Sequence, residues 1–93
     1  MKGFVKMKIK EGFMLREIAS QTMVVAIGEA SKTFNGIIRL NSTGKFLWEK
    51  LQSETTVEQL IDAITAEYDI DKQTANEDIL DFINTLKGAD LLA

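Results

Sequence analysis

The side chains of this chain that could take part in acid–base or metal-binding chemistry are almost all carboxylates, because the sequence has no histidine and no cysteine. It therefore lacks a thiol nucleophile, an imidazole base and the usual ligands of zinc or an iron–sulfur cluster. Four carboxylates come close together in the sequence: Asp62, Glu67, Asp69 and Asp71. They span an expected helix and turn without the glycine-marked loop of a calcium site, so we interpret them as solvated charge. No acid and base stand out as a catalytic pair, and we expect neither catalysis nor a cofactor.

The charges are divided unevenly along the chain. The net charge is −3 over 93 residues. Residues 1–54 carry +4 and residues 55–93 carry −7. The two halves thus present opposite fields to a partner, although a mixed solvated surface explains most of these charges equally well.

Three strands are expected before the middle of the chain. Residues 13–18 and 22–27 are rich in apolar and β-branched side chains and are separated by residues 19–21, which predicts a hairpin. Residues 28–36 have a glycine at each end and predict a wide turn with Phe34 as its anchor. Residues 37–40 then predict a third strand, antiparallel to the second and at an edge of the sheet.

Three helices are expected after the strands. The first spans about residues 42–52 and has Gly44 in its first turn, where close backbone packing would account for a glycine. Thr56 and Gln59 fit a capping box for the second helix, which ends near Tyr68. Asp71 is the expected N-cap of a third helix that ends with Gly88 in the left-handed conformation. The apolar stripe of the third helix is Ala75, Ile79, Phe82, Ile83 and Leu86.

These elements predict one α+β domain over residues 1–93, with a three-stranded antiparallel sheet followed by three helices. Residues 1–10 alternate lysine with apolar residues and read as an edge strand or a loose N-terminal arm. No segment has the length and apolarity of a signal peptide core or a membrane span. We therefore expect a soluble, cytoplasmic protein without membrane contact, either a monomer or a dimer that exchanges a strand.

Several segments together resemble one family. The order and spacing of a leucine-asparagine-x-threonine-glycine junction and a following tryptophan carry most of the resemblance. The segments are Gly12 to Arg16, Leu40 to Gly44, Phe46 to Trp48, Tyr68 to Asp71, and Asp78 with Phe82 and Leu86. They resemble the PqqD family, the peptide-recognition domain (RiPP recognition element) used in making pyrroloquinoline quinone and other modified ribosomal peptides. The resemblance covers residues 11–92.

The resemblance implies a winged helix-turn-helix-like domain that binds the leader of a precursor peptide. The leader would add as a strand beside the third strand and lie in a groove walled by the third helix. The protein would be a non-catalytic adaptor that presents the peptide to a separate enzyme, commonly a radical S-adenosylmethionine (radical SAM) protein. Carried over by position, the binding residues are Ile37, Ile38, Arg39, Leu40, Ala75, Asp78, Ile79 and Phe82.

Each of these residues also has an ordinary structural interpretation. Without the resemblance, residues 37–40 would be read as a core strand, and Arg39 as a solvated charge rather than a partner for an acidic leader residue. Asp78 fits a local hydrogen bond as well as a ligand contact. The third helix has only Lys72 and Lys87 as basic residues, so its acidity favours a leader with a basic residue near Asp78 and Asp81.

Two alternative functions fit the same expected fold. A winged-helix protein can bind nucleic acid, but phosphate neutralisation needs lysine and arginine, whereas the expected recognition helix is acidic. We therefore expect no nucleic-acid partner. The other alternative is a general protein–protein adaptor that uses the same strand edge and has no role in peptide modification.

Overall fold

The computed structural model describes residues 6–32, 34 and 38–93. The sheet has the order β1-β2-β3, with both pairs antiparallel. Its strands are β1 (Phe13–Ile18), β2 (Gln21–Ala26) and β3 (Ile38–Leu40), and the helices are α1 (Ser42–Lys50), α2 (Val57–Glu67) and α3 (Lys72–Gly88). The predicted α+β fold is confirmed, and nothing in the arrangement contradicts a winged helix-turn-helix-like form.

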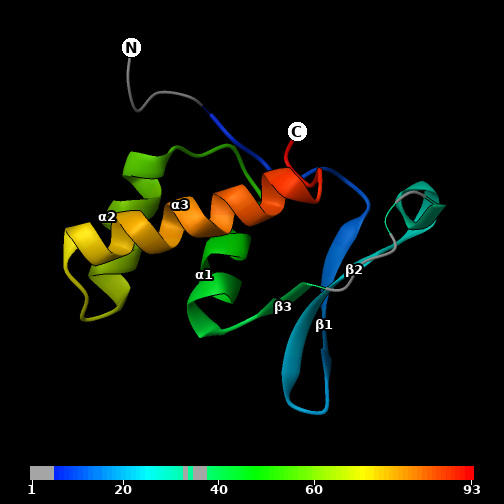
Figure 1. The fold of residues 1–93 in the computed structure, drawn as a ribbon, viewed down its shortest axis with the longest axis horizontal. Helices are drawn as coiled ribbons and strands as arrows, with labels where there is room; N and C mark the ends of the chain where they lie inside the picture. Colours follow the sequence, from blue (N-terminus) through cyan, green and yellow to red (C-terminus); the bar gives the residue numbers. More distant parts are fainter. Residues whose placement is uncertain (1–5, 33, 35–37) are drawn as a thin grey trace.

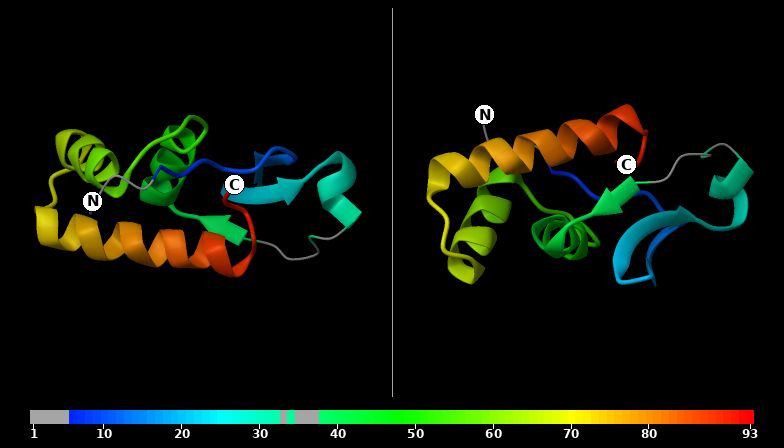
Figure 2. Two further views of the ribbon diagram at one scale, coloured as in Figure 1. Left: turned by 90° about the horizontal axis from the view of Figure 1, so that it is seen from above. Right: turned by 60° about the horizontal axis from the view of Figure 1, so that its bottom comes forward.

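The sheet and the helices occupy different ends of the molecule. The β1–β2 hairpin projects away from the helices, and β3 lies between this hairpin and α1 (Figure 1). Helix α3 runs across the helical end, and its C-terminal half approaches β3 (Figures 1 and 2). Because β3 leads into α1 after only Asn41, the sheet and the helical layer are joined with no loop to relax their angle.

The hairpin turn is two residues long, one fewer than predicted. Ala19 and Ser20 have φ of 52° and 67°, the left-handed values of a type I′ turn, whose twist matches that of the strands. Ile18 then pairs with Gln21. Strand β2 consequently begins one residue before the predicted start.

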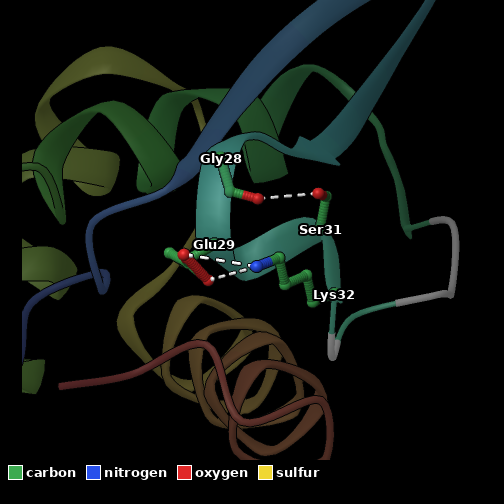
Figure 3. A network of polar contacts seen from close by, with 4 residues as sticks. All are labelled: Gly28, Glu29, Ser31 and Lys32. Atoms are coloured by element: carbon green, nitrogen blue, oxygen red, sulfur yellow. Dashed lines mark hydrogen bonds and ion pairs between the residues drawn. The ribbon is translucent and has the colours of Figure 1, made fainter.

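The first part of the predicted wide turn over residues 28–36 forms a short 3-10 helix, η1 (Gly28–Lys32). Residues 33, 35 and 36 lie outside the described residues. Within it, the Ser31 hydroxyl donates to the Gly28 carbonyl at 2.7 Å, and Lys32 Nζ lies 3.2 Å from a Glu29 carboxylate oxygen (Figure 3). The Phe34 ring meets the Phe13 ring edge-on at a centroid distance of 5.3 Å. The prediction that Phe34 anchors this segment is therefore confirmed.

The hydrophobic core joins one face of the sheet to all three helices. Val24 contributes from the sheet, Leu47 and Trp48 from α1, and Leu60 and Ile64 from α2. Trp48 is 3% exposed, while Phe46 is half-buried, with its ring 5.6 Å from that of Tyr68. Of the two α1 aromatics, Trp48 is thus the core residue.

The predicted N-terminal arm covers residues 1–10, of which residues 1–5 lie outside the described residues. The segment from Met7 to Lys10 is neither a strand of the sheet nor a loose arm. Met7 and Ile9 are buried. The Met7 amide donates to the Thr55 carbonyl at 2.8 Å, and the Ile9 amide donates to the Leu51 carbonyl at 2.9 Å. These apolar side chains fill the core beside α1, which is why the segment is held in place.

The helix boundaries follow local capping signals, with one exception. The predicted capping box at Thr56 and Gln59 is present, and Asp71 caps α3. Gly88 is the last residue of α3, and the left-handed conformation falls on Asp90, with φ of 61°. The Leu91 amide then donates to the Leu86 carbonyl at 2.9 Å, and the Leu91 side chain is buried in the core.

Candidate functional site

The free edge of β3 presents the backbone of one described residue, Arg39. Strand β3 pairs with β2 through Thr22–Leu40, Met23–Arg39 and Val24–Ile38. In an antiparallel pair, opposed residues alternate between those that exchange backbone hydrogen bonds and those that do not. The alternation in the hairpin therefore decides which β3 residues bond to β2.

The hairpin assigns the two kinds of pair. A two-residue turn is flanked by a bonded pair, here Ile18 and Gln21. The same alternation makes Gly12 and Ile27 a bonded pair, and the Ile27 amide donates to the Gly12 carbonyl at 2.8 Å. Thr22 and Val24 consequently turn their N–H and C=O groups towards β3, where they meet Leu40 and Ile38. The N–H and C=O of Arg39 point the other way, to the open edge.

The side chains of β3 alternate in burial as a half-buried strand requires. Ile38 and Leu40 are half-buried against the core, whereas Arg39 is exposed. Ile37, which was predicted to belong to this edge, lies outside the described residues. The described part of the predicted edge is thus three residues long, with its apolar side chains inward and its one charge outward.

A hollow of about 250 Å³ lies between α3 and the start of α1, including its N-cap Asn41. One wall is formed by Asn41, Thr43, Gly44 and Leu47, and the other by Asp78, Asp81 and Phe82. We call this hollow the groove. Its floor is apolar at Leu47 and Phe82, and its α3 wall carries two exposed carboxylates. It brings together two of the predicted helix residues, Asp78 and Phe82.

Two other predicted wall residues, Ala75 and Ile79, are corrected by the structure. Both are fully buried on the core side of α3. Successive residues of a helix are turned by 100°, so the residues of one apolar stripe point in different directions. Part of the α3 stripe borders the groove, and the rest faces the core. Ala75 and Ile79 therefore support the wall from behind and offer no surface to a ligand.

The junction between β3 and α1 is held by Asn41. Its side-chain oxygen accepts from the Gly44 amide at 2.8 Å and from the Thr43 hydroxyl at 3.0 Å, which caps α1. A Cβ on Gly44 would lie 3.2 Å from that oxygen and 3.4 Å from Leu40 Cβ. The close packing expected at Gly44 is present, and it fixes α1 against the end of β3.

A second, wider hollow of about 610 Å³ lies on the other side of the junction. It runs from the hairpin turn to the first turn of α1 and is lined by Ser20, Gln21, Thr22, Arg39, Leu40, Asn41, Ser42 and Lys45. Its charged residues are cations, whereas those of the groove are carboxylates. The junction thus separates a basic side from an acidic side.

The sequence did not identify Asn41, Thr43 and Leu47 as groove residues. These three residues fall within the segments that resemble the PqqD family, but the resemblance gives them no place in the groove. The available signal was position alone, because a strand that passes directly into a helix brings the first helical turn beside the strand's open edge. The sequence around the junction between β3 and α1 does not show that α3 packs opposite it.

Of the four carboxylates that cluster in the sequence, Asp71 has a structural role as the N-cap of α3. The Thr74 amide donates to Asp71 Oδ1 at 2.7 Å. The hydrogen bonds from Thr74 lower the pKa of Asp71 below its ordinary value. Within the described part of the chain, no group of three acidic side chains is placed to hold a metal ion.

The fold and site define a small α+β domain with an open strand edge beside a helix-walled groove. A sequence model of the family described as coenzyme PQQ synthesis protein D (PqqD) matches residues 11–92. The chain belongs to the PqqD family. Among residues 6–32, 34 and 38–93, no helix has the length and apolarity to cross a membrane.

A solved structure described as TbiB1 in complex with the TbiA(beta) leader peptide is similar to this chain. The two are 26% identical, the match covers 91% of this chain and 93% of that chain, and the TM-score is 0.70. No curated protein gives a significant match.

Proposed function

We propose that this protein is a non-catalytic adaptor that binds the leader of a ribosomally made precursor peptide as a fourth strand beside β3. The observation that carries the proposal is the outward backbone of Arg39, two residues before Asn41, which lines the groove. Family membership and the similarity to a protein solved with a leader peptide support it. Ile38, Arg39 and Leu40 form the edge, and Phe82 with Asp78 forms the wall.

In strand addition, affinity and selectivity come from different contacts. Hydrogen bonds to the Arg39 N–H and C=O depend little on the sequence of the peptide. Alternate peptide side chains point to opposite faces of the extended sheet, so every second side chain faces the groove. There, Leu47 and Phe82 accept an apolar side chain. Selectivity therefore rests on the groove-facing residues.

The acidic wall makes a basic leader residue the matching charge. Asp78 and Asp81 are exposed, and the ion pairs in the described part of the chain, Lys10–Asp90 and Lys32–Glu29, involve neither. We expect the double substitution Asp78→Lys and Asp81→Lys to weaken leader binding by about two- to ten-fold, in line with exposed ion pairs. The effect should shrink as salt is raised.

The matched control is Glu58→Lys and Asp62→Lys on α2. Both residues are exposed and do not line the groove. The control changes the net charge by the same amount, so it removes long-range charge effects from the comparison. Equal affinity of the α3 variant and the wild type would contradict the basic-residue assignment.

The partner and cellular setting follow from the adaptor role. The proposed partner is a separate modifying enzyme, and we propose that it is a radical SAM protein. Its substrate is made on the ribosome, so we place the protein in the cytoplasm. We treat residues 1–93 as one domain. If the β3 edge is reserved for the peptide, the protein is a monomer. A dimer would form by exchange of a strand between two copies.

Hydrogen exchange at single amides tests strand addition directly. The probe is a synthetic leader from a short reading frame adjacent to this chain's gene, added to the labelled protein and followed by NMR. The Arg39 amide should become protected, because it gains a ladder hydrogen bond, while the outward Glu17 amide on β1 should not change. A leader that binds without protecting the Arg39 amide would refute strand addition at this edge.

A further inference from the structure

One row of side chains crosses the outer face of the sheet and ends at the peptide edge. Arg16 is opposite Met23, and Met23 is opposite Arg39. Opposed residues share a face. Arg16 and Arg39 are exposed and are the two arginines of the chain. A fourth strand would add one more member to this row, directly beside Arg39.

The outer face contains no described acidic side chain that could neutralise Arg39. By the strand register, the residues on this face are Met14, Arg16, Ile18, Gln21, Met23, Val25 and Arg39. The acidic residue within the strands, Glu17, lies on the opposite face. Neither of the ion pairs of the described residues includes Arg39. A negative charge for Arg39 is therefore best supplied by an added strand.

The two faces of an added strand would meet opposite charges. The peptide residue beside Arg39 shares the outer, basic face, and the residues before and after it turn towards the groove with Asp78 and Asp81. A slip of one residue exchanges the two sets. It would move an acidic side chain towards the carboxylates and a basic one towards Arg39, so the charges penalise the wrong register.

We infer that the peptide residue opposite Arg39 is acidic, and that this pair sets the register in which the leader docks. The ligand class is a short extended segment with an outward Asp or Glu between inward residues that are apolar or basic. The inference rests on the proposed strand addition. An opposed charge pair on an exposed sheet face changes affinity by up to about five-fold.

A displayed library of random twelve-residue peptides tests the inference without knowledge of the natural leader. Selections are run on immobilised wild type, on Arg39→Glu and on Arg16→Glu. The wild type should enrich peptides with an Asp or Glu flanked by apolar or basic residues. Arg39→Glu should enrich Lys or Arg at that position. Arg16→Glu, two strands away on the same face, should select like the wild type.

One enriched peptide then gives the pairwise effect. Replacing its acidic residue with lysine should weaken binding to the wild type by up to about five-fold and strengthen binding to Arg39→Glu. Circular dichroism melting checks that both variants are folded. Enriched peptides with no acidic preference, or the same preference on Arg39→Glu, overturn this inference alone. A wild-type selection that enriches no peptide overturns the proposed function and this inference with it.

Discussion

The two edges of the sheet have the same backbone chemistry but different surroundings. On β1, the residues that do not bond to β2 are Phe13, Leu15 and Glu17, so their N–H and C=O groups face outward just as those of Arg39 do on β3. The β1 edge is the longer one, yet the hairpin projects away from the helices (Figure 1). The β3 edge is short but runs into Asn41, which lines a groove walled by α3.

Under the proposed function, the peptide uses the β3 edge and not the longer β1 edge, because the β3 edge leads into a helix-walled groove. An unpaired edge offers hydrogen bonds to any extended chain, which is a liability for aggregation as much as a means of recognition. In the proposed complex, the helix wall would add contacts for every second side chain of the peptide and so make docking selective. Variants that remove the wall, the edge or the junction separately can therefore test this contrast.

Removal of the wall has the largest expected effect. Phe82→Ala should weaken leader binding by about 2 kcal/mol or more, the scale of a central aromatic contact, and leave β3 as an edge without an apolar wall. Phe82 is half-buried and lines the groove. The measurement is titration calorimetry with the leader peptide.

The matched control for the wall is Ile83→Val. Ile83 is 4% exposed and packs in the core. Its substitution should cost about 0.5–1.5 kcal/mol of stability, without a change in the affinity of the folded protein. If Phe82→Ala lowered only the unfolding temperature and left the affinity intact, the wall would have no role in recognition.

Removal of the edge amide comes next. Arg39→Pro deletes the outward N–H of β3, and Glu17→Pro deletes the corresponding outward N–H of β1. Loss of one backbone hydrogen bond from the complex corresponds to about ten-fold weaker binding. We expect this loss for Arg39→Pro and an unchanged affinity for Glu17→Pro, measured by the same titration.

Proline at Ile38 distinguishes an amide at the open edge from an amide that bonds to β2. The Ile38 amide faces β2, so Ile38→Pro breaks the pairing with Val24 and should lower stability rather than affinity alone. Equal effects of proline at Arg39 and Glu17 on binding would mean that the two edges are equivalent.

The junction gives a smaller effect that again separates binding from stability. Asn41→Ala removes the cap of α1 and should cost about 1 kcal/mol of stability. Because Asn41 also lines the groove, this change should weaken leader binding two- to three-fold, or about 0.5 kcal/mol. Asp71→Ala removes the cap of α3 far from the groove, and should lower the melting temperature without a change in affinity.

The pH dependence of stability gives the smallest effect. The pKa of Asp71 is lowered by the hydrogen bonds from Thr74, so the folded protein holds this proton more weakly than the unfolded chain. The stabilisation is present above the ordinary pKa of the carboxyl and is lost as the pH falls through the lowered value. Asp71→Asn keeps the cap but cannot titrate, so its denaturant midpoint should fall less on acidification than that of the wild type. Parallel curves would contradict this assignment.

Much of the fold was readable from local patterns. The capping box at Thr56 and Gln59 and the cap at Asp71 identified where helices begin, since a cap is satisfied within four residues. Apolar periodicity identified the strands and helices. The length of the turn at Ala19 and Ser20 was predicted one residue too long, because neither residue is the glycine or asparagine that normally marks a type I′ turn.

The candidate site was less predictable than the elements that form it. The motif that indicated the family also indicated β3 and the third helix, and Asp78 and Phe82 do lie at the groove. Ala75 and Ile79 belong to the same apolar stripe but face the core. The alternation of the N-terminal segment did not show where it packs, because Met7 and Ile9 are held by residues more than forty positions away in the sequence.

The sequence by itself determined the order of the elements, the helix starts and the absence of thiol and imidazole chemistry, because these depend on residue types and near neighbours. Only the tertiary structure decided that the Arg39 backbone faces outward and which arc of α3 borders the groove. The first depends on a register counted from the hairpin turn, and the second on how α1 and α2 pack against α3. Neither is fixed by residues close to the site in the sequence.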